Sequence, residues 1–247
     1  MESIVRSIER AGLTPNGTVG DANYNQFADA IEIITDEKLQ NLMLSNFSQV
    51  SNPKNFELRG VAASSKAFVA VGAADGTDAY LLRGSRTVIG LGEISNPKNF
   101  SLNGVAWGGG AFVAVGNADG ADAYIIKTTN ELGESGWLEK SNPKNVTLKA
   151  VAHNGSLYVA VGNADGSDAY IVTSPDGDTW TERANPKNVG LLGVAWNGSL
   201  WVAVGQADGS DAYIVTSPDG INWTERANPK NFALYSVAWN GKSFVAV

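Results

Sequence analysis

The chain has 247 residues, of which 43% are hydrophobic and 17% charged, and its formal net charge is -7. This balance excludes intrinsic disorder, and the negative charge argues against a nucleic-acid partner, because phosphates are bound by clustered Lys and Arg. Cysteine is absent, so disulfides and thiolate metal sites are excluded. No apolar run reaches the roughly 20 residues that span a bilayer, and the charged start MESIVRSIER is not a signal peptide.

Residues 1–45 follow a different pattern from the rest of the chain. Ile4, Ile8 and Leu13 share a helical stripe. This helix is expected to end at Pro15 and the Asn-Gly turn pair that follows it. From about residue 21 to 43 the apolar positions recur at spacings of 3 to 5, which predicts a second amphipathic helix. We therefore expect a small helical segment over 1–45. The text ADAIEIIT (28–35) also resembles the repeated SDAYIVT, so a strand there is the alternative.

The rest of the chain, residues 46–247, is repetitive. Asn-Pro-Lys-Asn recurs at intervals of 43 to 46 residues, beginning at Asn52, Asn96, Asn142, Asn185 and Asn228. A period of this length with several short strands per unit is typical of a β-propeller. In one unit we expect strands over 189–196, 199–205, 212–217 and 222–227, joined by short turns rich in Gly and Asp.

These counts predict an all-β fold, a five-bladed β-propeller of four-stranded repeats preceded by the helical segment. The last repeat stops after two strands, and residues 46–51 resemble a fourth strand. The simplest closure pairs strand 46–51 into the last blade, which removes a free sheet edge. The missing strand is then supplied by residues 28–35, or the last blade is incomplete, or Val247 is not the natural end of the protein.

The turns at Ser174-Pro175-Asp176-Gly177 and Ser217-Pro218-Asp219-Gly220, each followed by a tryptophan, resemble the Asp-box hairpins of several propeller families. Their expected role is local, because the Asp side chain accepts hydrogen bonds from backbone N–H groups of the turn and the aromatic ring packs beneath it. This resemblance implies blade architecture and no particular activity.

No constellation for catalysis is apparent. His153 is the sole histidine and occupies a slot that other repeats fill with tryptophan, so we expect it to be packed against a strand. Arg183 and Arg226 are one repeat position on an outer strand and do not predict a convergent arginine cluster. The sequence predicts that the protein is not an enzyme and needs no cofactor.

The two repeated non-strand segments should lie on one face. In a blade whose strands run up and down, the Asn-Pro-Lys-Asn connection and the Ala-Asp-Gly-x-Asp loop emerge together, and we call this the loop face. Its amide, ammonium and carboxylate groups suit sugar hydroxyls; the alternative is a structural turn in which each lysine pairs with a nearby aspartate. The candidate ligand-binding residues are Lys54, Lys98, Lys144, Lys187, Lys230, Asn55, Asn99, Asn145, Asn188, Asp75, Asp119, Asp165 and Asp208.

The same loops contain two carboxylates three residues apart, a spacing that calcium also uses. The weak calcium candidates are Asp165 with Asp168 and Asp208 with Asp211. Asp-Gly is equally the ordinary chemistry of a tight turn, where Gly adopts a positive φ and Asp bonds its own backbone. The turn explanation is favoured, and no metal site is predicted.

Residues 8–31 are similar to a segment of bacteriophage tail fibre and tail appendage proteins. The matching positions form an Ile-Glu-x-Ala-Gly-Leu-Thr-Pro start, residues 8–15, and a Gln-Phe-x-x-Ala-Ile helix, residues 26–31. The resemblance implies a non-enzymatic, trimeric virion tail protein, made in the host cytoplasm, whose N-terminus binds other tail proteins and whose propeller binds a host surface glycan or protein. The alternative is a cellular propeller lectin or interaction scaffold.

Overall fold

The computed structural model describes residues 53–54, 56–85 and 91–247. The chain divides into two compact units, Met1–Val50 and Ser51–Val247, and all described residues belong to the second. The predicted helices within 1–45, the alternative strand 28–35 and the closing strand 46–51 lie outside the described residues. Those that are described form strands, turns and loops without a helix, and none of their segments is a helix that could cross a membrane.

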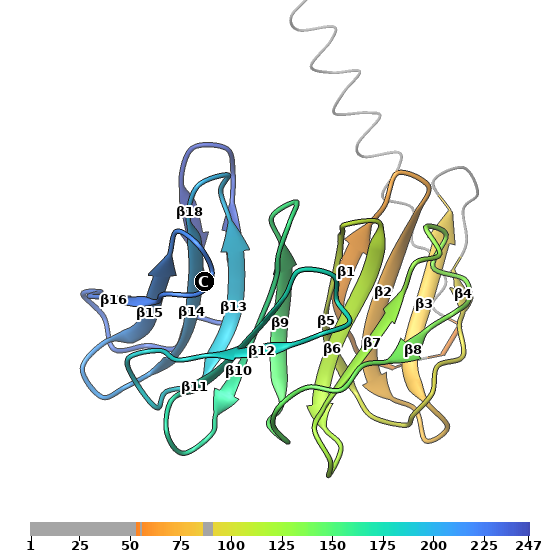
Figure 1. The fold of residues 1–247 in the computed structure, drawn as a ribbon, viewed down its shortest axis with the longest axis horizontal. Helices are drawn as coiled ribbons and strands as arrows, with labels where there is room; N and C mark the ends of the chain where they lie inside the picture. Colours follow the sequence, from red (N-terminus) through yellow and green to blue (C-terminus); the bar gives the residue numbers. More distant parts are fainter. Residues whose placement is uncertain (1–52, 55, 86–90) are drawn as a thin grey trace, which may run out of the picture. The chain divides into compact units, whose positions relative to one another are not determined.

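Four four-stranded antiparallel sheets and one two-stranded sheet follow one another along the chain (Figure 1). We number them blades 1 to 5. Blade 1 contains β1 (Leu58–Ala63), β2 (Ala67–Ala74), β3 (Ala79–Ser85) and β4 (Gly92–Glu93), and blade 2 contains β5 (Leu102–Gly108), β6 (Ala111–Ala118), β7 (Ala123–Thr128) and β8 (Leu138–Glu139). Blade 3 contains β9 (Leu148–His153), β10 (Tyr158–Ala164), β11 (Ala169–Ser174) and β12 (Thr181–Arg183). Blade 4 contains β13 (Leu191–Trp196), β14 (Trp201–Ala207), β15 (Ala212–Ser217) and β16 (Thr224–Arg226), and blade 5 contains β17 (Val237–Trp239) and β18 (Phe244–Ala246).

The predicted all-β fold with repeated four-stranded sheets is confirmed. In the unit laid out from the sequence, β15 has the predicted bounds, and the other three strands differ from the predicted ones by one to two residues at an end. Within each blade the strands pair in chain order, so the turns alternate between the two ends of the sheet. In Figure 1 the β1–β2 hairpin lies at the top and the β2–β3 loop at the bottom.

The hydrophobic core lies between successive blades. One buried cluster joins Val113 and Ile125 of blade 2 to Tyr158 and Val172 of blade 3, and similar clusters join blades 1 and 2 and blades 3 and 4. The second and third strands are therefore covered on both faces, which explains their continuous apolar runs. The first strands, β1, β5, β9, β13 and β17, lie next to one another along the series.

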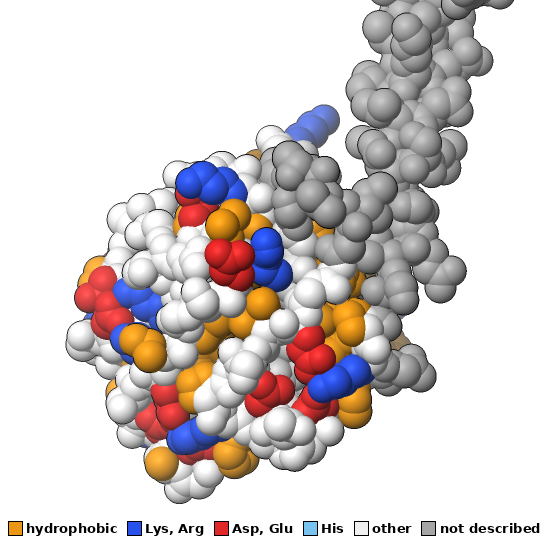
Figure 2. Space-filling view, turned by 90° about the vertical axis from the view of Figure 1, so that its right-hand side faces the viewer, with side chains coloured by type: hydrophobic (Ala, Val, Ile, Leu, Met, Phe, Trp, Pro, Cys, Tyr) orange, Lys and Arg blue, Asp and Glu red, His pale blue; other side chains and the backbone are white. Residues whose placement is uncertain are grey.

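The described surface carries both signs of charge side by side. On the side that faces the viewer in Figure 2, Lys and Arg side chains lie beside Asp and Glu side chains and do not gather into a patch of one sign. This intermixing agrees with the repeated ion pairs of blades 1 to 4.

Candidate functional site

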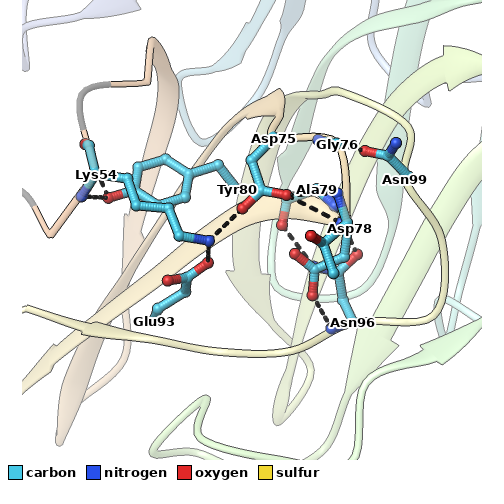
Figure 3. Close-up of polar contacts among 10 residues, drawn as sticks. Lys54, Asp75, Gly76, Asp78, Ala79, Tyr80, Glu93, Asn96 and Asn99 are labelled. Atoms are coloured by element: carbon cyan, nitrogen blue, oxygen red, sulfur yellow. Dashed lines mark hydrogen bonds and ion pairs between the residues drawn. The ribbon is translucent and has the colours of Figure 1, made fainter.

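Each lysine of an Asn-Pro-Lys-Asn connection that enters blades 1 to 4 lies between two carboxylates. Lys98 Nζ is 2.6 Å from Asp119 Oδ2 and 2.5 Å from Glu139 Oε1. The same arrangement occurs in blades 1, 3 and 4 (Figure 3 shows blade 1), with the members Lys54, Asp75, Glu93; Lys144, Asp165, Glu182; and Lys187, Asp208, Glu225. The structure thus brings four of the five predicted lysines to their predicted aspartates on the loop face.

The aspartate of each cluster is fixed by its own loop. Asp75 Oδ1 accepts hydrogen bonds from the N–H groups of Thr77 at 2.8 Å and Asp78 at 3.1 Å. Gly76, which lies between Asp75 and Thr77, has a φ of 99°, which glycine adopts without strain. Asn99 of the next connection accepts a hydrogen bond from Gly76 N at 3.1 Å (Figure 3). Asn145, Asn188 and Asn231 repeat this contact in blades 2, 3 and 4.

These contacts shift the pKa values of the paired groups. The hydrogen bond from Lys54, followed by those from the Thr77 and Asp78 N–H groups, lowers the pKa of Asp75 to about 2. The hydrogen bond to Asp75, followed by that to Glu93, raises the pKa of Lys54 above its ordinary range. Asp75 and Lys54 are therefore both charged at neutral pH.

In the connections that enter blades 2, 3 and 4, the first asparagine binds two blades. Asn142 Nδ2 donates to Ala123 O of β7 at 2.6 Å, and its backbone N–H donates to Asp122 at 2.9 Å. Its Oδ1 accepts from the hydroxyl of Tyr170 of β11 at 2.8 Å. The Tyr170 oxygen in turn accepts from Lys144 N at 3.0 Å. Asn142 therefore links blade 2 to blade 3, and Asn96 and Asn185 make the equivalent link on either side.

The calcium candidates belong to the same clusters. Asp165 and Asp168 with Glu182, and Asp208 and Asp211 with Glu225, bring carboxylate oxygens within 4.8 Å of one another. In both clusters a lysine ammonium contacts two of the three carboxylates. The second aspartate accepts a backbone hydrogen bond from the next connection, as Asp168 does from Asn185 N at 3.0 Å. The positive charge of the cluster thus comes from the chain itself.

Two predicted members are not placed in such a cluster. Asn55 lies outside the described residues. Lys230 enters blade 5, whose described part ends at β18, and among the described residues it has no ion pair. Sequence reasoning missed two further sets of residues, although both recur at a constant place in the first four repeats. These are the glutamates Glu93, Glu139, Glu182 and Glu225 and the hydroxyls of Tyr80, Tyr124, Tyr170 and Tyr213.

The Ser-Pro-Asp-Gly turns make the expected local bonds. Asp176 Oδ1 accepts from Asp178 N at 2.8 Å and Thr179 N at 3.1 Å, and Asp219 does the same in blade 4. Trp180 is buried, and its indole N–H donates to Gly177 O at 3.3 Å. These turns consequently stabilise the ends of blades 3 and 4.

The residues considered for catalysis do not converge. His153 is half-buried at the end of β9, with its ring centroid 4.3 Å from that of Tyr158, and burial lowers its pKa. The expectation of a packed strand histidine is confirmed. Arg183 donates to Thr173 and Arg226 to Thr216, each within its own blade.

A cavity of about 880 Å³ lies among the first strands of all five blades. These strands share the pattern Leu-x-Gly/Ala/Ser-Val-Ala, which in blade 5 begins before β17, and the second residue of the pattern differs in every repeat. The five residues at this position, all lining the cavity, are Arg59, Asn103, Lys149, Leu192 and Tyr235. Sequence reasoning missed this site, although aligning the repeats shows the variation; that the position faces a cavity is visible only in the fold.

Successive four-stranded antiparallel sheets whose first strands surround one cavity define a β-propeller. The chain belongs to the family of DUF6242 β-propeller domains, which matches residues 97–243, more than half of its length. No curated protein matches the chain. Neither this family match nor the structures named next point to a phage tail protein, so the resemblance of residues 8–31 to tail fibres stays a prediction.

The fold is also similar to that of solved propellers. YCF48 bound to D1 peptide is 15% identical with a TM-score of 0.55, over 77% of this chain and 59% of that one. YCF48 from Cyanidioschyzon merolae is 14% identical with a TM-score of 0.56, over 78% and 63%. The Niastella koreensis GH74 enzyme is 14% identical with a TM-score of 0.59, over 76% and 33%. The chain thus spans less than two thirds of each structure, and at these identities the likeness concerns the fold alone.

Proposed function

We propose that this protein is a non-catalytic binding scaffold whose ligand occupies the cavity among the first strands. The observation that supports this is the position shared by Arg59, Asn103 and Lys149 with Leu192 and Tyr235, where near-identical repeats present five different side chains to one space. A single ligand that contacts several blades meets a different chemistry on each, which favours one asymmetric partner over five equivalent sites. One propeller of similar fold is bound to a peptide, which supports a macromolecular ligand by analogy.

The loop face is the weaker candidate for binding. Its lysines and aspartates in blades 1 to 4 already neutralise one another, and its asparagines are bonded to backbone groups. A sugar that bound there would have to replace these contacts. The predicted glycan ligand of this face therefore has less support than a ligand of the cavity.

The test uses the whole chain and two broad probes, a random peptide display library and a glycan array. Leu192→Trp places a large ring in the cavity without removing a hydrogen bond, and Val245→Trp adds the same ring at an exposed position of β18. We expect the strongest binders of the unaltered protein to be lost with Leu192→Trp and kept with Val245→Trp. Binders that survive both changes would contradict the proposal.

A second proposal concerns where the scaffold acts. The phage-like motif in residues 8–31 favours a virion appendage in which the N-terminal segment attaches a trimeric protein to other tail proteins and the propeller contacts the host surface. The cellular interaction scaffold is the alternative. Light scattering on the intact chain, together with binding to host envelope fractions, tests this proposal; a monomer that binds no envelope fraction counts against it.

A further inference from the structure

The cavity has an excess of positive charge inside an acidic protein. The residues around it include the cations Arg59 and Lys149 and a single carboxylate, Glu57. The chain as a whole carries a formal charge of -7. The positive potential of the cavity attracts a negatively charged group, whereas the net negative charge of the protein as a whole repels such a group.

The guanidinium of Arg59 is held in place by its neighbours. Arg59 Nη2 lies 3.0 Å from Glu57 Oε2, and Nη1 donates to Asn103 Oδ1 of the next blade at 2.9 Å. Asn103 Nδ2 donates to Asn117 Oδ1 at 3.0 Å and to Leu148 O at 2.8 Å. This network across blades 1 to 3 fixes one donor group before any ligand arrives, which lowers the entropy cost of binding.

Lys149 is a second cation, and its charge is uncompensated. Among the described residues its ammonium has neither an ion pair nor a hydrogen-bond partner, whereas the lysines of the clusters in blades 1 to 4 each contact two carboxylates. It is half-buried on β9 and lines the cavity with Arg59. A carboxylate placed there would gain a charge-assisted hydrogen bond without breaking an existing one.

The remaining blades offer apolar contact. Leu192 of blade 4 is half-buried, and Tyr235 of blade 5 is 71% exposed, although both line the same cavity. An exposed tyrosine supplies a large contact area at low entropy cost. The cavity therefore presents cations and amides from blades 1 to 3 and an aliphatic and an aromatic side chain from blades 4 and 5.

We propose that the ligand is an acidic peptide segment, with its carboxylates at Arg59 and Lys149 and an apolar side chain at Leu192 and Tyr235. This inference rests on the proposed function, that the cavity is the binding site. The volume of about 880 Å³ suits a short stretch of such a peptide. A neutral glycan would leave the charge of Lys149 unused, and a homopolymer would not exploit five different side chains.

The test measures fluorescence anisotropy of labelled ten-residue peptides with the whole chain. The probe alternates Asp or Glu with Leu and Phe, and its counterparts carry Asn or Gln, or Lys, in place of the acids. Lys149→Glu is the test variant, and Lys242→Glu, on the β17–β18 turn, is the control with the same net charge. We expect the acidic probe to bind at least about tenfold more tightly than either counterpart, and more weakly as salt increases.

We further expect Lys149→Glu to weaken binding by about tenfold or more, and Lys242→Glu to change it less than about twofold. Equal effects of the two variants, or equal binding of the acidic and amide probes, would overturn the inference. If amide or basic probes bind and Leu192→Trp abolishes that binding, the cavity remains the site and only the acidic class is wrong. If no probe depends on Leu192, the proposed function fails as well.

Discussion

In the connections that enter blades 1 to 4, the lysine ammonium pairs with the aspartate carboxylate of the adjacent loop. Asp119 is almost fully buried, with 1% of its side chain exposed, whereas Lys98 keeps 37% of its side chain exposed. Removing the ammonium would leave a buried carboxylate without its charge partner, which is more costly than losing a surface ion pair. The repeat of this cluster in four blades points to a stabilising role for the loop-face lysines.

Replacing Lys98 with Met should therefore destabilise the propeller. We expect the free energy of unfolding to fall by about 1–3 kcal/mol, because the buried carboxylate loses a charged partner. Chemical denaturation measures this change. Lys230→Met is the matched control, since Lys230 occupies the same repeat position without an ion pair among the described residues, and it should change stability by less than about 0.5 kcal/mol. Equal losses in the two variants would show that the cluster is not stabilising.

Acid should weaken the same clusters. The pKa of Asp75 is lowered to about 2 by Lys54 and the turn N–H groups, and Lys144 and Lys187 likewise lead the lowering at Asp165 and Asp208. A carboxylate whose pKa is lower in the folded state stabilises the fold above its ordinary pKa of about 4 and loses this contribution as pH falls further. We expect the Tm to be steady from pH 7 to 5 and to fall between pH 4 and 2. A Tm that is flat over the lower range contradicts this.

Calcium should have little effect, for the same reason. An ion entering the cluster of Asp165, Asp168 and Glu182 would have to displace the Lys144 ammonium. We expect the Tm to be unchanged, within error, when EDTA is replaced by millimolar calcium. A rise that saturates with calcium concentration would instead identify a metal site, because a ligand that binds the folded state raises its stability.

At the scale of the element, the connection between two blades also links them by hydrogen bonds. Asn142 bonds the start of β7 behind it and the tyrosine of β11 ahead of it, and its neighbour Lys144 bonds the same tyrosine through the backbone. Pro143 between them cannot donate a backbone hydrogen bond, and its fixed φ suits a tight connection. The repetition of Asn-Pro-Lys-Asn is thus explained by geometry, without a ligand.

A double-mutant cycle tests this hydrogen-bonded link between blades 2 and 3. Asn142→Ala and Tyr170→Phe should each lower the free energy of unfolding by about 1–2 kcal/mol, because each leaves a part-buried polar group unpaired. The double variant should lose less than the sum, with a coupling energy of about 1 kcal/mol, since one hydrogen bond is shared. Thermal or urea unfolding gives all three values, and strict additivity would contradict a direct link between the two blades.

Much of the element level could be predicted from the sequence. The strands follow from short apolar runs between Asp-Gly and Asn-Gly turns, and the pairing of Lys98 with Asp119 follows from the alternation of turns between two ends of a sheet. The pairing of the outer-strand glutamate with the lysine was not predicted, because a strand of two residues such as β8 is too short to show from the sequence which way its side chains face. The hydroxyl of Tyr170 was missed because its partner lies 28 residues earlier, across a blade boundary.

At the scale of the whole molecule, the cavity depends on contacts that a linear reading does not contain. Arg59, Asn103 and Lys149 are 44 to 46 residues apart and meet only because the first strands of successive blades are neighbours. The candidate binding residues predicted from the sequence are at positions that are nearly identical among the repeats. In the fold these residues bond loops and neighbouring blades, whereas the residues that differ among the repeats face the cavity.

The order along the chain of the two blades that each asparagine bonds has a consequence for biosynthesis. In the connections that enter blades 2, 3 and 4, the first asparagine can bond the blade behind it as soon as it is made, but its second partner is a tyrosine 28 residues further along the chain. On a ribosome, blades 1, 2 and 3 would therefore each be bonded to the next blade less than one repeat after their own last strand has emerged. The blades can therefore pack one after another from the N-terminal side. The face of each new blade stays exposed to solvent only until the next repeat has been made and covers it.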